Sequence, residues 1–212
     1  MHSSETITLE RAAAFLRISE QAVRDLVRDG ALSSTRTGSE WHFKIEDLEK
    51  FVAPTTSAAV PILNAVLSLD CVAIVEDANK EIALRQLIAM LGKKSQVNSI
   101  SELTNAIFNR EKLMSTGIGM GIGIPHVRLR SVTDLTVAVL LVKNGIPDYE
   151  SMDAKSVKII FMIAARENQH ALYLKLLSQI SSFLKIEKNR TILKECCCPE
   201  DLYHKLKGYD DE

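Results

Sequence analysis

The chain has 212 residues, of which 46% are hydrophobic and 25% charged, and its net charge is −1 at neutral pH. These values are ordinary for a globular protein of one or two domains, and the charge gives no whole-chain signal for nucleic acid. No apolar run reaches the roughly 18–20 residues that span a bilayer, and the N-terminus lacks the pattern of a signal peptide, so we expect no membrane insertion.

Cysteine usage favours a reducing, cytoplasmic location. There are four cysteines, and three of them are contiguous at 196–198, which is no disulfide framework. Three adjacent cysteines cannot easily converge on one ion, so we expect partly buried thiols and no metal site.

Residues 1–53 predict a small helical module. Two short helices, over 9–16 and 20–29, are joined by so tight a turn that the pair fits a helix-turn-helix. A hairpin or wing over 32–44 and a third helix over 46–52 follow. This order of elements resembles the winged helix-turn-helix fold of excisionase/MerR-type DNA-binding domains.

If this module binds DNA, its second helix would enter the major groove and its wing would contact the backbone or the minor groove. Residues 1–55 hold seven Lys and Arg against nine Asp and Glu, a net charge of −2, whereas DNA affinity depends on neutralising phosphates. A degenerate protein-interaction module therefore remains an open alternative. Helix-turn-helix proteins commonly pair to read two half-sites, so a homodimer is open too, although no dimerisation helix stands out. The candidate nucleic-acid contacts are Gln21, Arg24 and Arg28 on the second helix and Arg36 and Lys44 on the wing.

A polar stretch of small residues between two prolines marks a linker at 54–60. Strands then alternate with helices, which predicts an α/β domain with a central sheet over 61–212. The expected strands are 71–75, 135–142 and 157–163, the last two of them buried. The expected helices are one that starts at Asp77 or Asn79 and ends at Leu91, then 99–109, 170–185 and two shorter ones at the end.

Residues 117–124 alternate glycine with isoleucine or methionine, so we interpret them as an extended segment with one glycine face and one apolar face. A strand accepts so much glycine where a backbone or a ligand approaches closely. The spacing fits neither a dinucleotide fingerprint nor a P-loop. Pro125 stiffens the exit and presents His126, whose neutral imidazole is a nucleophile near pH 7, sixteen positions after Arg110.

The run Arg110-Glu, Ser115-Thr-Gly-Ile-Gly and Gly121-Ile-Gly-Ile-Pro-His126 resembles the phosphorylation-site signature of the type-2 enzyme IIA domains. These are the fructose/mannitol and nitrogen-regulatory members of the bacterial phosphoenolpyruvate phosphotransferase system. The resemblance covers residues 61–207 and implies a mixed sheet flanked by helices. It also implies that His126 accepts a phosphoryl group on Nε2 from a histidine-phosphorylated carrier protein, with no cofactor. Arg110 matches the arginine of the motif, and His170 matches a second histidine that opens a leucine-rich helix.

Each of these residues also has an interpretation that involves no function. Arg110 would otherwise be a surface ion pair or a helix C-terminal cation, and His170 would otherwise cap its helix. Arg128 and Arg130 either attract an anionic partner or are simply solvated.

The sequence predicts a two-domain regulator in which up to about two negative charges added at His126 change contacts with DNA or a partner. One alternative is a plain phosphocarrier for sugar uptake with a docking module. Another is a regulator that binds only proteins.

Overall fold

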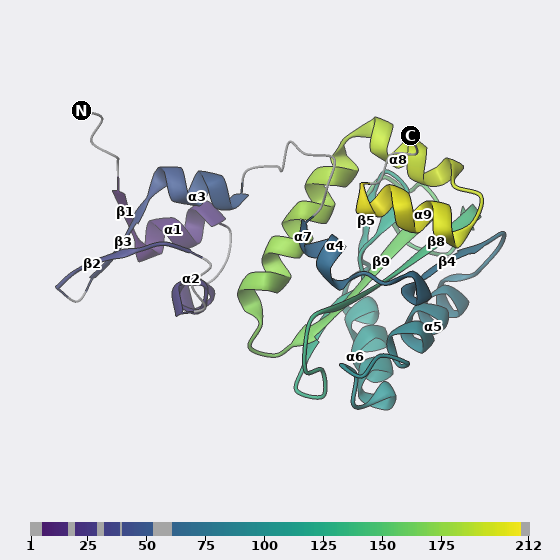
Figure 1. The fold of residues 1–212 in the computed structure, drawn as a ribbon, viewed down its shortest axis with the longest axis horizontal. Coiled ribbons are helices and arrows are strands. Elements are labelled where there is room, and N and C mark those ends of the chain that lie inside the picture. Colours follow the sequence, from purple (N-terminus) through teal and green to yellow (C-terminus); the bar gives the residue numbers. More distant parts are fainter. Residues whose placement is uncertain (1–5, 17–19, 29–31, 39, 53–60, 209–212) are drawn as a thin grey trace.

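The computed structural model describes residues 6–16, 20–28, 32–38, 40–52 and 61–208 (Figure 1). The predicted linker at 54–60 lies outside this part of the chain, as does the expected end of the second helix at Asp29. Within the described residues no helix is both long enough and apolar enough to cross a membrane.

The N-terminal module is a helix-turn-helix with a small antiparallel sheet. Its strands pair in the order β1-β3-β2, and the β2–β3 hairpin is the predicted wing. Buried Val23, Leu26 and Phe43 form its core together with residues of the other helices. The elements are β1 (Thr6–Thr8), α1 (Leu9–Leu16), α2 (Glu20–Arg28), β2 (Thr35–Thr37), β3 (Glu40–Lys44) and α3 (Ile45–Val52).

The second domain is built on a mixed six-stranded sheet. Its main path runs β4-β8-β9-β6-β5, and β7 pairs with β9 off that path. The β4–β8, β6–β9 and β7–β9 pairs are parallel, whereas β8–β9 and β5–β6 are antiparallel. The long central strands are almost entirely buried, as continuous runs of Val, Ile and Leu predict. The strands are β4 (Val72–Val75), β5 (Gly117–Gly119), β6 (Ile122–Gly123), β7 (His126–Leu129), β8 (Thr136–Ile146) and β9 (Val157–Arg166).

Helices cover both faces of this sheet. α5 packs with α6 on one side, and α7 and α9 lie across the sheet from them (Figure 1). The capping predictions hold, because the Asn79 and Ser99 side chains accept the backbone N–H groups of Ile82 and Glu102. The helical segments are α4 (Pro61–Val66), η1 (Leu69–Cys71), α5 (Lys80–Leu91), α6 (Ile100–Leu113), α7 (His170–Lys185), α8 (Glu187–Glu195) and α9 (Pro199–Lys207).

The glycine-rich segment is not the single extended strand that its alternation predicts. Met120 and Gly121 both have positive φ, 60° and 78°, and form a tight turn that folds the segment into the β5–β6 hairpin. Such primed turns match the twist of the strands they join. The expected close approach does occur at Gly117, where an added Cβ would lie 2.2 Å from the Glu150 carbonyl oxygen.

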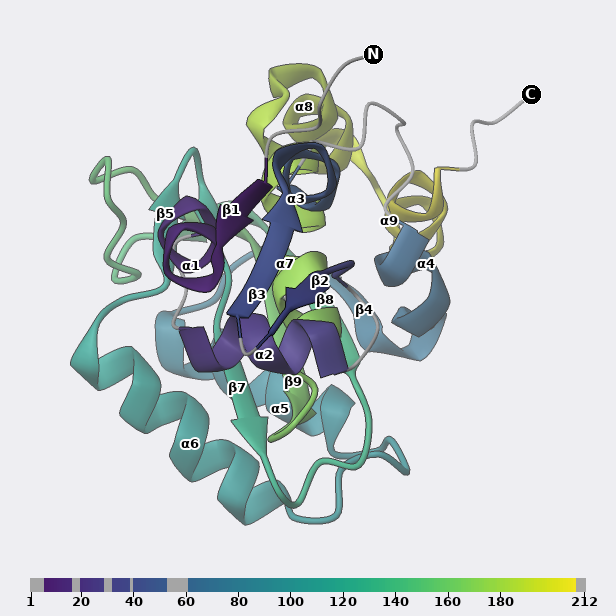
Figure 2. The same cartoon turned by 90° about the vertical axis from the view of Figure 1, so that its left-hand side faces the viewer.

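The two domains touch through α7. Helices α2 and α3 contact α7, and α2 crosses in front of it in Figure 2. Ala171, in the first turn of α7, is 4% exposed and belongs to the hydrophobic cluster of the N-terminal module. The helix that the sequence predicts to read DNA therefore packs against the helix that His170 opens.

Candidate functional site

His126 is the first residue of β7, an element that the sequence does not predict. The strand pairs in parallel with β9, so His126 lies opposite Ile163, and the Pro125 carbonyl accepts the Ile163 N–H at 2.9 Å. The ring nitrogen Nδ1 of His126 lies 2.7 Å from the Ile124 carbonyl oxygen. Because a carbonyl only accepts, Nδ1 carries the proton and Nε2 of the neutral ring is left with a lone pair.

The environment keeps this ring neutral. Burial lowers the pKa of His126 below its usual 6.5, and the positive charges of Arg110 and Arg128 lower it further. The hydrogen bond to Ile124 and the charge of Glu111 oppose this shift without reversing it. At neutral pH the side chain is therefore a nucleophile with a defined tautomer.

Arg110 lies on the last turn of α6, which runs four residues beyond the predicted end at Asn109. Its guanidinium donates to the Met114 carbonyl at 2.7 Å and forms no ion pair with a carboxylate of the described residues. Its charge lowers the pKa of both His126 and Tyr173, as expected of a cation close to the site. Arg110 is therefore a cation at the C-terminal turn of α6, and its part in a phosphoryl-accepting site stays a prediction.

His170 joins the site through Arg128 and Tyr173. The Tyr173 ring meets the His126 ring edge-on at 5.8 Å between centroids, and the Arg128 guanidinium lies 5.5 Å from the Tyr173 centroid. Arg128 also contacts the His170 ring. Arg128 and His126 share a face of β7 because they are two residues apart. Arg130 instead pairs with Glu167 at 2.6 Å on the surface.

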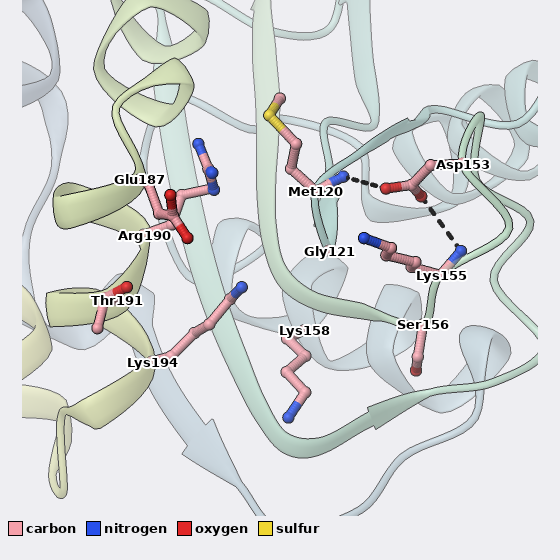
Figure 3. A pocket seen from close by; sticks show the side chains of 10 residues that line it. All are labelled: Met120, Gly121, Asp153, Lys155, Ser156, Lys158, Glu187, Arg190, Thr191 and Lys194. Atoms are coloured by element: carbon pink, nitrogen blue, oxygen red, sulfur yellow. Dashed lines mark hydrogen bonds between the residues drawn. The ribbon is translucent and has the colours of Figure 1, made fainter.

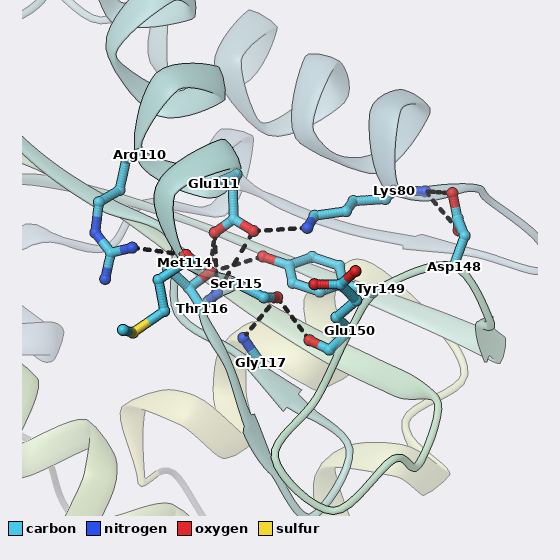
Figure 4. Close-up of polar contacts among 10 residues, drawn as sticks. All are labelled: Lys80, Arg110, Glu111, Met114, Ser115, Thr116, Gly117, Asp148, Tyr149 and Glu150. Atoms are coloured by element: carbon cyan, nitrogen blue, oxygen red, sulfur yellow. Dashed lines mark hydrogen bonds and ion pairs between the residues drawn. The ribbon is translucent and has the colours of Figure 1, made fainter.

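A network of polar contacts around Glu111 holds the segment that precedes His126, and Figure 4 shows its residues. The Glu111 carboxylate accepts the Thr116 N–H at 3.2 Å, contacts the Thr116 hydroxyl and pairs with the Lys80 ammonium at 2.9 Å. The Thr116 carbonyl in turn accepts the N–H of Ile124, whose own carbonyl orients the His126 ring. Glu111 was not predicted as a site residue, although its place beside Arg110 in the motif was the available signal.

Apolar side chains stand exposed next to the site. Leu113 and Met114, directly after Arg110, are 84% and 70% exposed. Neighbouring exposed apolar residues of this kind are typical of a surface that another protein covers.

The five predicted nucleic-acid contacts do not gather on one face. Arg24 and Arg36 line one hollow, and Arg24 pairs with Glu20 at 3.1 Å there. Lys44 lines a different hollow, on the opposite face of the β-ribbon from Arg36, because alternate residues of β3 point to opposite sides. Gln21 and Arg28 are exposed on α2. The first hollow also contains Glu10, Glu20 and Glu40.

The cysteines are all free thiols. Cys196 is buried between α8 and α9, and burial raises its pKa to about 12, whereas Cys197 and Cys198 are exposed. Among the residues that the structure describes, no cluster of three His, Cys, Asp or Glu side chains could hold a metal ion.

The protein therefore consists of a helix-turn-helix module joined to an α/β domain, and the α/β domain carries a neutral histidine close to two arginines. Residues 65–209 match the family described as "Phosphoenolpyruvate-dependent sugar phosphotransferase system, EIIA 2", and the chain belongs to this family. Residues 6–55 match the family described as "Helix-turn-helix domain". The predicted type-2 enzyme IIA domain and the predicted helix-turn-helix module are therefore confirmed, and the excisionase/MerR type of the module stays a prediction.

Relatives come from both branches of the family. The chain is 38% identical over 121 residues to the fructose-specific EIIABC component of Bacillus subtilis, matching 57% of this chain but only 19% of that protein. It is 32% identical over 134 residues to the fructose-specific EIIA component of Haloferax volcanii, matching 63% of this chain and 86% of that one. The crystal structure of nitrogen regulatory protein IIA-Ntr from Neisseria meningitidis superposes with a TM-score of 0.63 at 26% identity, covering 68% of this chain and 99% of that one.

Proposed function

We propose that His126 accepts a phosphoryl group from a histidine-phosphorylated carrier protein. The observation that carries this proposal is the neutral His126 ring, whose Nδ1–H is held by Ile124 while its Nε2 lone pair is left for the incoming phosphorus. The transfer forms the bond between phosphorus and His126 Nε2 and breaks the corresponding bond to the donor imidazole. With the other ring nitrogen of the donor carrying a proton, the donor leaves as a neutral imidazole, Nδ1 of His126 keeps its proton, and the positive charge passes from the donor ring to the His126 ring, so no proton has to move.

Arg110 and Arg128 supply the positive charge that this reaction requires. Phosphoryl transfer depends mainly on positioning and on stabilising the charge of the equatorial oxygens. Neither guanidinium is neutralised by an ion pair with a carboxylate of the described residues, so both remain available to an arriving phosphoryl group. His170, in contact with Arg128, positions that arginine from the start of α7.

Phosphorylation at His126 then controls the N-terminal module. The contact of α2 with α7 brings the predicted DNA-reading helix onto the helix whose Tyr173 packs against His126. A phosphoryl group brings up to about two negative charges to this corner and redirects Arg128, whose present partner is His170. The protein is then a cytoplasmic regulator whose DNA binding reports the phosphorylation state, and its free thiols suit that compartment.

A module that binds protein in place of DNA is the second candidate. It is favoured by the hollow in which Glu10, Glu20 and Glu40 surround Arg24 and Arg36. Acidic side chains at this place oppose a phosphate backbone and suit a basic or mixed protein surface.

Intact-protein mass spectrometry tests the acceptor. The full chain and a His126→Ala variant are incubated with phosphoenolpyruvate and the general phosphotransferase components, and are kept at neutral to alkaline pH. One phosphoryl adduct is expected on the wild type and none on the variant. An adduct on both proteins, or on neither, contradicts the assignment of His126.

A DNA titration at several salt concentrations tests the readout. Regulation of DNA binding predicts a steep salt dependence and different affinities for the phosphorylated and unphosphorylated chain. An Ala171→Glu variant places a charge in the domain contact and is expected to fix the chain in the released state, so that phosphorylation no longer changes its affinity. Equal, weak binding by all forms would leave the protein-binding candidate or a plain phosphocarrier, and the stoichiometry of any complex shows whether two copies bind.

A further inference from the structure

A second charged site lies away from His126, in a hollow of about 420 Å³ between α8, the β5–β6 turn and the segment that leads into β9 (Figure 3). Along β9, the hollow lies near Ile159, whereas His126 pairs with Ile163. Four residues of strand separate the two places by about 13 Å. The lining residues are Met120, Gly121, Asp153, Lys155, Ser156, Lys158, Glu187, Arg190, Thr191 and Lys194.

The cations of this hollow are not neutralised. Within the described residues, no carboxylate forms an ion pair with Lys155, Lys158, Arg190 or Lys194. In Figure 3 the Lys155 and Lys194 ammonium groups point into the space between α8 and the turn. Burial, followed by the positive charges of Arg190 and Lys158, lowers the pKa of Lys194, as happens when like charges share a partly enclosed place.

The acidic residues of the hollow do little to offset this charge. Asp153 accepts the Met120 N–H at 2.8 Å, the Lys155 N–H at 3.1 Å and the Ser151 hydroxyl at 3.0 Å, so it serves to hold the turn. Glu187 is exposed at the start of α8. The lining therefore keeps a positive excess of two charges.

Backbone contacts fix the shape of the hollow. Nη1 of Arg190 donates to the carbonyls of Leu184 and Lys185 at 2.6 and 2.8 Å, so the guanidinium is held at the end of α7. Gly121 leaves the floor open, because a Cβ there would lie 3.7 Å from the Lys194 ammonium nitrogen and 3.4 Å from the Ser156 carbonyl oxygen. Arg190 is therefore held beside an open space, and the side-chain entropy cost of ordering this residue on a ligand is reduced.

We propose that this hollow binds a small phosphorylated molecule that carries at least two negative charges. Ammonium and guanidinium groups are the usual partners of phosphate oxygens, and bonds between such charged groups are stronger than neutral ones. The volume lies within the range of about 300–1,000 Å³ that small-ligand sites occupy. A concave site with Met120 as its only large apolar side chain suits a compact polar ligand better than a flat protein contact. The site is independent of His126 and gives the chain a second input besides the carrier protein.

Calorimetric titration of the full chain at low ionic strength tests this proposal with inorganic phosphate, pyrophosphate, ADP and fructose 1,6-bisphosphate. Hexaglutamate serves as the protein-like acidic probe. At least one phosphorylated probe is expected to bind saturably, and Lys194→Glu is expected to weaken it about tenfold or more, because it reverses a charge in direct contact. The relative affinities of pyrophosphate, ADP and the sugar bisphosphate show whether a base or a sugar adds to the shared phosphate chemistry.

Lys188→Glu is the matched control, since Lys188 is exposed on the same helix and does not line the hollow. It makes the same change of charge and is expected to alter binding by less than about twofold, because solvent screens exposed charges. Lys194→Gln removes the charge without adding a carboxylate, in case the reversal prevents folding, and phosphorylation of His126 reports that each variant is folded. Equal weakening by both reversals, tighter binding of hexaglutamate than of any phosphorylated probe, or no saturable binding would overturn the proposal.

Discussion

Replacing Glu111 with leucine removes the carboxylate that connects Lys80 to the segment leading to His126. The change leaves the Lys80 ammonium without its partner at 2.9 Å and the Thr116 N–H without its acceptor. Removing one member of a buried ion pair costs about 3–5 kcal/mol. The Lys80 side chain is 20% exposed and the Thr116 hydroxyl keeps the Tyr149 hydroxyl at 2.8 Å, so the loss is partly offset. We expect the free energy of unfolding to fall by about 2–4 kcal/mol.

Glu81→Leu is the control for this prediction. It removes a glutamate from the Arg85–Glu81 pair, whose side chains are 60% and 63% exposed and whose N–O distance is 2.8 Å. Exposed pairs contribute little, so the expected loss is below about 1 kcal/mol. Both changes replace a glutamate that pairs with a basic side chain, Lys80 in one case and Arg85 in the other, and the two pairs differ strongly in burial.

Urea unfolding can assign the loss to the correct domain. Trp41 is the only tryptophan and lies in the N-terminal module, whereas all four tyrosines follow residue 148. Tryptophan fluorescence therefore follows the small module, and near-ultraviolet circular dichroism adds the tyrosines of the larger domain. Glu111→Leu should shift the unfolding transition of the larger domain and leave that of the N-terminal module unchanged. It should also slow phosphorylation, since Thr116 holds Ile124 and Ile124 orients His126. A loss no larger than that of Glu81→Leu would refute the reasoning.

Three further predictions concern the acceptor and its surroundings. Protonation removes the nucleophile, so the phosphorylation rate should be constant at neutral pH and fall with a midpoint below 6.5, and Arg110→Gln should move the pKa of His126 upward in an NMR titration. Gly117→Ala should lower the melting temperature severely, because its Cβ would lie 2.2 Å from a backbone carbonyl oxygen, whereas Gly38→Ala, at φ +64° in open space, should cost only about 1–2 kcal/mol. Leu113→Glu should slow transfer from the carrier without changing the melting temperature, because Leu113 is 84% exposed.

The sequence predicts the elements with strong periodicity and clear end signals. The helix His170–Lys185 has the predicted bounds, and the Asn79 and Ser99 caps lie where short polar side chains precede apolar helical patterns. Two buried strands are also correct, since only a covered sheet accepts continuous runs of Val and Ile. In these segments local preference and tertiary packing agree.

The errors fall where backbone conformation or distant partners decide the structure. Alternation predicts an extended glycine segment, but it does not show that Met120 and Gly121 adopt positive φ and reverse the chain. β7 was missed because its four residues form a strand only through pairing with β9, a distant segment.

The polar partners of the site were missed for the same reason. Arg128 and Glu111 lie next to or within the recognised motif. The contact of Arg128 with Tyr173 forms only in the folded chain. The same holds for the contacts of Glu111 with Lys80 and Thr116. The contact of α2 with α7 likewise leaves no pattern in either segment alone.

The contact of α2 with α7 determines how phosphorylation of His126 could affect the N-terminal module. Ala171 is covered by the N-terminal module, while Tyr173, two residues further along α7, packs on His126. The residue that contacts His126 and the residue that the module covers therefore lie within one turn of α7, so coupling between the two places would need no long pathway. Coupling between two sites is typically about 1–3 kcal/mol, or 5–150-fold in affinity. A rearrangement of Arg128 alone can supply energy on this scale, because a charge-assisted hydrogen bond contributes about 1.5–3 kcal/mol. If phosphorylation of His126 weakens the contact of the module with α7, then by reciprocity DNA or a partner that draws the module away from α7 changes the phosphorylation equilibrium of His126 by the same factor.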